Sequence, residues 1–175
     1  MNYIEYADFV KTTDLYKKDA SYNCTVLIGL VSELGEYCDH IKKYLRGDYD
    51  TLDKHLLVKE LGDILWYATS YYNSRMGDRE KERPVVTSIP HPSFDDNVEA
   101  RVLTSELVVC VMELIKQSME MDDEEFSTAW NDIHGAISDN AKFLGYTYED
   151  VLRINYEKLS KRLKDGTIKG SGDNR

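Results

Sequence analysis

The fold is decided by residues 25–76, which read TVLIGLVSELGEYCDHIKKYLRGDYDTLDKHLLVKELGDILWYATSYYNSRM. Apolar residues recur in this stretch every three to four positions, and a short polar turn from Gly47 to Thr51 interrupts the pattern. Such a pattern predicts two helices, Thr25 to Arg46 and Leu52 to Met76. Because a short turn joins them, we expect the two helices to pack antiparallel as a core hairpin.

A near-repeat gives each of these two helices a pair of acidic residues. It reads Glu33-Leu34-Gly35-Glu36 on the first helix and Glu60-Leu61-Gly62-Asp63 on the second. Residues three positions apart share one face of a helix. Glu36 and Glu60 each lie 12 residues from Asp48, and Glu33 and Asp63 each lie 15 residues from it. A hairpin that closes symmetrically near Asp48 therefore brings all four carboxylates to one level.

Four carboxylates at one level repel one another unless a cation neutralises them. Oxygen-only ligands suit a hard ion such as Mg²⁺, Mn²⁺ or Ca²⁺ rather than Zn²⁺. The alternative is a solvated acidic stripe, since glutamate is a good helix former and is common on exposed helix faces. The second helix is apolar nearly all round, which indicates that Glu60 and Asp63 point into a covered space. The spacing alone leaves both interpretations open.

The rest of the chain also has helical character, and no stretch of comparable length alternates like a strand. We therefore expect an all-α bundle of five to six helices that forms a single domain over residues 1–175, with a loop insertion at 77–97 and a flexible tail at 166–175. Thr147 is the expected N-cap of the last helix. The four further helices are expected at Tyr3 to Tyr16, Val98 to Met119, Glu124 to Phe143 and Tyr148 to Lys164.

The composition excludes several classes of partner and site. The chain has 175 residues and a net charge of −10, which disfavours binding to nucleic acid or to anionic membranes. The three cysteines are an odd number without paired spacing, as in a reduced cytoplasmic protein. The four histidines form no Glu-x-x-His pair, which argues against a carboxylate-bridged di-iron bundle.

The last predicted helix carries a second polar group. Asn155, Lys158 and Arg162 stand at positions i, i+3 and i+7, so they share one helix face. Lysine and arginine on such a face can bind phosphate through charge and forked hydrogen bonds. The alternative is a solvated basic face, because cations are favourable near a helix C-terminus.

These residues together resemble the MazG-like all-alpha nucleoside triphosphate pyrophosphohydrolase superfamily. The likeness rests on the two acidic pairs, on the run from Glu60 to Tyr67 that reads ELGDILWY, and on Asn155-x-x-Lys158-x-x-x-Arg162. It covers mainly residues 25–76 and 145–165. The resemblance implies hydrolysis of a nucleoside triphosphate, ribo or deoxy, between its α and β phosphates, giving a monophosphate and pyrophosphate.

The resemblance also implies roles for individual residues. Glu33, Glu36, Glu60 and Asp63 would be the magnesium ligands, and Glu33 or Glu36 would accept the proton of the attacking water. Asn155, Lys158 and Arg162 would bind the substrate. Many relatives carry a further glutamate where this chain has Ser32, which leaves open how many metal ions bind and which glutamate is the base.

Two further expectations follow from the resemblance. Members of the superfamily usually form dimers or tetramers, so we expect a homo-oligomer, and Trp66, Tyr71 and Tyr72 either pack between subunits or belong to the core. A role in clearing unwanted nucleotides is the second expectation, and the base and sugar of the nucleotide are left open. A noncatalytic helical assembly or regulatory protein is the competing interpretation, and it predicts that magnesium changes nothing.

Overall fold

In the computed structural model, the described residues form six helices, in agreement with the predicted all-α fold. The structure describes residues 1–77, 84–87, 95–120 and 123–168. The loop prediction at 77–97 and the tail prediction at 166–175 therefore lie partly outside the described residues. The helices are α1 (Tyr3–Thr13), α2 (Tyr22–Leu45), α3 (Lys54–Met76), α4 (Asp96–Glu120), α5 (Asp123–Phe143) and α6 (Tyr148–Lys164).

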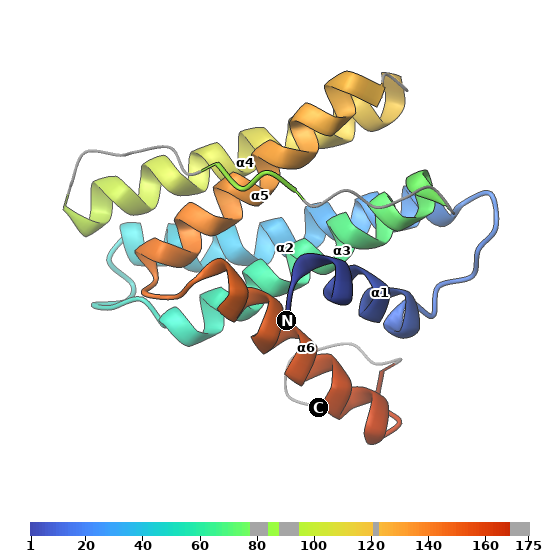
Figure 1. Cartoon of the computed structure of the whole chain (residues 1–175). Helices are drawn as coiled ribbons and strands as arrows, with labels where there is room; N and C mark the ends of the chain where they lie inside the picture. The colour runs from blue at the N-terminus through green and yellow to red at the C-terminus, as the bar shows by residue number, and fades with distance from the viewer. Residues whose placement is uncertain (78–83, 88–94, 121–122, 169–175) are drawn as a thin grey trace.

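The helices pack in pairs (Figure 1). Helices α2 and α3 form the predicted hairpin and make the largest contact between elements, while α4 lies beside α5 on one side of the hairpin. Helices α1 and α6 contact each other and α3 on the other side. Helix α3 is therefore surrounded, which explains why its sequence is apolar nearly all round.

Local polar contacts set the helix ends where the sequence pattern does not. Helix α1 ends at Thr13 rather than at the predicted Tyr16. The Asp14 carboxylate accepts hydrogen bonds from the Tyr16 backbone and from the Tyr22 hydroxyl, and these bonds stabilise a turn in place of the last helical residues. Helix α4 begins at Asp96, inside the predicted loop, because the carboxylate of Asp95 accepts from the backbone of the first turn. The predicted cap at Thr147 is confirmed, since its hydroxyl accepts from the backbone N–H of Asp150 at 3.1 Å.

The aromatic residues of α3 belong to the core of this chain. Trp66, Tyr71 and Tyr72 are all buried, and the Trp66 indole donates to the Thr13 hydroxyl at 2.9 Å. The core interpretation of these residues is thus confirmed. Of the cysteines, Cys24 is exposed although it lies in an apolar run, whereas Cys38 and Cys110 are half-buried, and all three are free thiols. No helix among the described residues has the length and apolar character needed to cross a membrane.

A buried histidine joins α5 to α1 and α6. The His134 ring packs edge-on against the rings of Tyr3 and Trp130, and its Nδ1 lies 2.5 Å from the Tyr148 hydroxyl. Burial lowers the pKa of His134 to about 3, so the ring is neutral in the folded protein.

The folded protein is expected to lose stability as the pH falls below 6.5. The unfolded chain takes up a proton on His134 near pH 6.5, whereas the folded chain does so only near pH 3. The stability associated with neutral His134 is therefore fully present above pH 6.5, and about 2 kcal/mol of it is lost at pH 5. Urea unfolding at pH 7 and pH 5 measures this loss.

Two variants isolate the contribution of His134 to that loss. His134→Phe keeps an aromatic ring and removes the titrating group. The free energy of unfolding of this variant should therefore fall by about 2 kcal/mol less between pH 7 and pH 5 than that of the wild type. The exposed His55, changed to glutamine, is the control and should leave the loss unchanged. An equal loss in His134→Phe and in the wild type would show that His134 is not the group responsible.

Candidate metal and phosphate site

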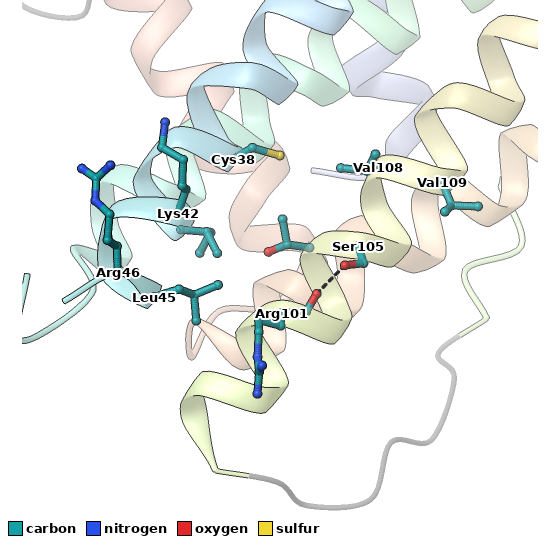
Figure 2. Close-up of a pocket in the computed structure, with 10 residues that line it drawn as sticks. Cys38, Lys42, Leu45, Arg46, Arg101, Ser105, Val108 and Val109 are labelled. Carbon is teal, nitrogen blue, oxygen red and sulfur yellow. Dashed lines mark hydrogen bonds between the residues drawn. The ribbon is translucent and has the colours of Figure 1, made fainter. Parts of the chain in front are cut away.

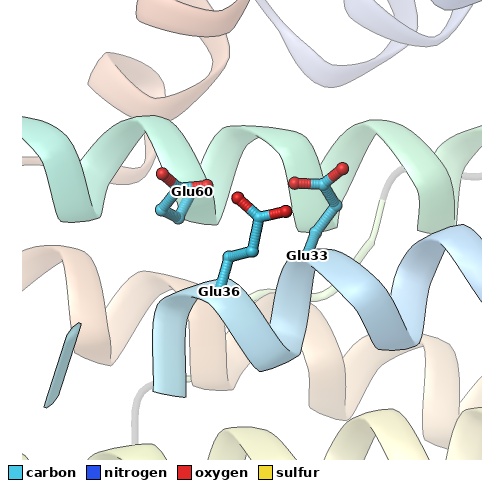
Figure 3. A group of neighbouring side chains, drawn as sticks. All are labelled: Glu33, Glu36 and Glu60. Carbon is cyan, nitrogen blue, oxygen red and sulfur yellow. The ribbon is translucent and has the colours of Figure 1, made fainter. Parts of the chain in front are cut away.

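Three of the four predicted acidic residues meet between α2 and α3. Glu33 and Glu36 on α2 are directed toward Glu60 on α3 (Figure 3). One oxygen from each of the three carboxylates lies within 4.8 Å of one from each of the other two. Such a set of carboxylate oxygens matches the ligands that Mg²⁺ and Mn²⁺ prefer.

The helix faces explain how these acids come together. Leu34 and Leu61 stand next to the acids in sequence and are buried, so they fix the rotation of the two helices about their axes. The acids then occupy the faces where α2 and α3 approach each other. Exposure decreases across the group, from exposed Glu36 through half-buried Glu33 to Glu60, which is 1 % exposed. A ligand can therefore reach the group from the Glu36 side.

The fourth acid, Asp63, has its carboxylate oriented by α6. The Nδ2 of Asn155 donates to Asp63 Oδ1 at 2.9 Å, and the Lys158 ammonium donates to Asp63 Oδ2. Asp63 and Lys158 are both largely buried, with side chains 16 % and 12 % exposed. Asp63 is not among the three acids whose oxygens lie within 4.8 Å of one another, although it stands one turn beyond Glu60 on α3.

The three polar residues of α6 differ in their surroundings. Asn155 is fully buried and Lys158 is directed at Asp63, so the alternative of a solvated basic face does not hold for these two residues. Arg162 follows Lys158 by one turn and is half-buried. Ser32, which replaces a glutamate of many relatives, is exposed on α2.

A glycine of the near-repeat permits the close approach of α3 and α6. A Cβ atom at Gly62 would lie 2.8 Å from the Cβ of Asn155 and 3.0 Å from its Nδ2. Any side chain at this position would push Asn155 away from Asp63. Gly35 is the equivalent glycine on α2, and a Cβ atom there would meet no other atom within 4 Å. The two glycines therefore differ in their structural roles, because the packing of α3 against α6 requires a glycine at position 62 and no such contact requires one at position 35.

Tyr67 is a further member of this region, and the sequence pattern marked it only as the last residue of the run that begins at Glu60. Its ring fills the space that a side chain at Gly29 of α2 would need, and its hydroxyl lies 2.8 Å from that of Tyr16. Burial, the contact with Tyr16 and the charges of Glu33 and Asp63 raise the pKa of Tyr67. The phenol therefore stays neutral beside the acids. In the sequence, its position at the end of the run from Glu60 to Tyr67 is the feature that associates it with the acidic residues.

A cavity lies on another side of α2. It has a volume of about 730 Å³ and opens between α2 and α4 (Figure 2). Its floor is apolar, with Cys38, Leu45 and Val108, and three cations stand at its edge: Lys42, Arg46 and Arg101. Lys42 and Arg46 form ion pairs with Asp39 and Asp48. The spacing of Cys38, Lys42 and Leu45 from Glu36 places this cavity on a different face of α2 from Glu33 and Glu36.

Comparison with known protein families bears directly on the α2–α3 hairpin. Residues 23–82 match the family model of the MazG nucleotide pyrophosphohydrolase domain. The resemblance to the MazG family is confirmed. The matched segment contains all four acids and both glycines of the near-repeat, whereas α1 and α4 to α6 lie outside it. Comparison with curated proteins and with solved structures gives no match.

The MazG-like segment is also complemented by one residue that no short motif predicts. Tyr6 of α1 is fully buried, and its hydroxyl donates to Asn155 Oδ1 at 2.8 Å. Tyr6 and Asn155 are 149 residues apart, and nothing in the local pattern of the N-terminal helix indicates this contact. The contact arises because α1 and α6 pack on the same side of α3.

Proposed function

We propose that the protein is a magnesium-dependent nucleoside triphosphate pyrophosphohydrolase. It would cleave ribo- or deoxyribonucleoside triphosphates between the α and β phosphates, giving a monophosphate and pyrophosphate. The observation that carries the proposal is the group of Glu33, Glu36 and Glu60, which lies in the MazG-like segment and offers only carboxylate oxygens. A nucleotide pyrophosphohydrolase is what the family match suggests.

The metal is proposed to be held by Glu33, Glu36 and Glu60, with Asp63 as the fourth ligand. Bound there, Mg²⁺ would act as a Lewis acid that offsets negative charge on the phosphate chain. Mn²⁺ has the same ligand preferences and is expected to substitute. The donor set fits such an ion because the acids come from two helices and leave the Glu36 side open to a phosphate chain.

The acidic and basic side chains would then have separate roles in the reaction. Glu33 or Glu36 accepts a proton from the attacking water, whose oxygen bonds to phosphorus as the bridging P–O bond breaks. Glu36 is exposed and Glu33 is half-buried, so solvent reaches both. Lys158 and Arg162 offset the negative charge of the phosphate chain. Asn155 is fully buried, so it contributes to substrate binding indirectly, through its hydrogen bond to Asp63.

The functional proposal is tested with a panel of ribo- and deoxyribonucleoside triphosphates, assayed with and without Mg²⁺. Pyrophosphate and orthophosphate release are measured separately for the wild type, Glu36→Gln and Asp63→Asn. We expect pyrophosphate release that requires the metal and that falls at least about 100-fold in both variants, because each loses a charged metal ligand. Wild-type rates in both variants would refute the ligand assignment. If no triphosphate is turned over, the noncatalytic alternative holds.

We further infer that residues 1–175 form one domain, because α1 and α6 pack on the same α3 that carries Glu60 and Asp63. A dimer or tetramer, a cytoplasmic location and a role in nucleotide clearance stay predictions. Sedimentation equilibrium tests the first of these.

A further inference from the structure

Helix α1 contributes a buried hydroxyl to the acidic site although it lies outside the MazG-like segment. Tyr6 is 0 % exposed, and its hydroxyl donates to Asn155 Oδ1 at 2.8 Å. Burial, followed by the negative charge of Asp63, raises the pKa of Tyr6, so the phenol keeps its proton and acts as a donor. The N-terminal helix is thus connected to the site by a directed hydrogen bond.

The direction of this bond decides which end of the Asn155 amide faces Asp63. An asparagine side chain has a donor end and an acceptor end that occupy nearly the same space. Because the Tyr6 hydroxyl donates to Oδ1, Nδ2 is left facing Asp63, to which it donates at 2.9 Å. The reversed amide would place Oδ1 against a carboxylate oxygen, and the two acceptors would repel. Tyr6 therefore specifies the orientation in which Asn155 supports an ionised Asp63.

Asp63 in turn is held by two neighbours on α6. Asn155 donates to one carboxylate oxygen and Lys158 to the other. Each carboxylate oxygen carries two lone pairs, so a hydrogen bond from Asn155 is compatible with a bond to a cation. Residues that orient a metal ligand in this way commonly change metal affinity by about 10- to 100-fold when they are replaced.

We propose that Tyr6 is a positioning residue of the acidic site: its hydroxyl fixes the Asn155 amide, and the amide holds Asp63 in the orientation needed for the divalent cation. This inference rests on the proposed role of Asp63 as a metal ligand. It extends the site to α1, which the family match does not cover. It also explains why Gly62 stands next to Asp63, since only a glycine lets Asn155 approach so closely.

The test uses Tyr6→Phe, which removes one oxygen and keeps the ring. Binding of Mn²⁺ is measured by electron paramagnetic resonance without nucleotide, and hydrolysis is measured at saturating metal. We expect the Mn²⁺ dissociation constant to rise about 10-fold and kcat to fall by a similar factor. The KM for the triphosphate should change by less than about 2-fold, because Tyr6 is buried and does not reach the substrate.

The chain offers a closely matched control. Tyr37 of α2 is also 0 % exposed, and its hydroxyl also donates to an asparagine, Asn140 Oδ1, at 2.8 Å. Tyr37→Phe should lower the melting temperature about as much as Tyr6→Phe while leaving Mn²⁺ affinity and kcat unchanged. A merely structural role for Tyr6 predicts that the two variants behave alike.

A double variant tests the route through Asn155. If Tyr6 acts only by orienting the amide, then Tyr6→Phe combined with Asn155→Ala should bind Mn²⁺ no more weakly than Asn155→Ala alone. Additive losses in the double variant would overturn the proposed route. Melting curves of all variants show whether each one is folded.

The outcomes separate this inference from the functional proposal. If the wild type binds Mn²⁺ and releases pyrophosphate but Tyr6→Phe matches Tyr37→Phe, the inference fails and the proposed function stands. If Tyr6→Phe weakens Mn²⁺ binding but no triphosphate yields pyrophosphate, the positioning role stands and the proposed function fails. Absence of Mn²⁺ binding by the wild type overturns both.

Discussion

Replacing Glu60 by glutamine is expected to reduce kcat/KM at least about 1,000-fold, equivalent to about 4 kcal/mol of transition-state stabilisation. Glu60 is the most buried of the three grouped acids, at 1 % exposure, so neither water nor a neighbouring exposed acid replaces its charge. Glutamine has nearly the same shape and retains one oxygen. The change therefore removes charge while leaving the packing of α3 intact.

A second measurement separates loss of the metal from loss of the fold. For the wild type, Mg²⁺ at about ten times its dissociation constant should raise the free energy of unfolding by about 1.4 kcal/mol, since the ion binds only the folded chain. For Glu60→Gln this increase should vanish. Glu125→Gln, an exposed acid on α5, is the control and should respond to Mg²⁺ as the wild type does. If Glu60→Gln retains the full Mg²⁺ response, Glu60 is not a ligand.

The two glycines of the near-repeat are expected to respond to alanine with opposite signs. In Gly62→Ala the new methyl group would lie 2.8 Å from Asn155 Cβ, so α3 and α6 must move apart. Such overpacking costs about 1–3 kcal/mol, which the higher helix propensity of alanine offsets by less than about 1 kcal/mol. We expect Gly62→Ala to be less stable than the wild type by about 1–2 kcal/mol. Hydrolysis should fall about 10-fold, because Asn155 is displaced from Asp63.

In Gly35→Ala the methyl group meets no atom within 4 Å. The higher helix propensity of alanine is then the only effect that remains, so this variant should be more stable than the wild type by about 0.5–1 kcal/mol. Urea unfolding of the two variants measures the difference, which we expect to reach about 2 kcal/mol. Equal stabilities would mean that the approach of Asn155 to Gly62 is not as close as the structure has it.

The local features of this fold were predictable from the sequence because periodicity and capping are local. The hairpin of α2 and α3 followed from apolar spacing on either side of a polar turn, and the N-cap at Thr147 followed from a hydroxyl residue before an acidic first turn. The helix ends near Asp14 and Asp95 were displaced by side-chain contacts with nearby backbone groups, which propensity alone does not specify.

The candidate site was predictable only in part. The equal spacing of the four acids about Asp48 predicted that their carboxylates lie at one level, and three of them meet in the structure. The orientation of Asp63 depends on Asn155 and Lys158, which follow it by 92 and 95 residues, and on how α6 packs against Gly62. Tyr6 is still more remote, since its role depends on α1 and α6 sharing one side of α3. Such contacts are set by tertiary packing and leave no periodic signal in the chain.

The central claim is that this acidic group directs cleavage between the α and β phosphates, and its most direct test is the identity of the products. Phosphorus NMR of a nucleoside triphosphate incubated with the wild-type protein and Mg²⁺ distinguishes the two bonds that water can break. We predict the signals of a nucleoside monophosphate and pyrophosphate, absent when Mg²⁺ is chelated and absent with Glu60→Gln. A nucleoside diphosphate and orthophosphate as the products would contradict the account.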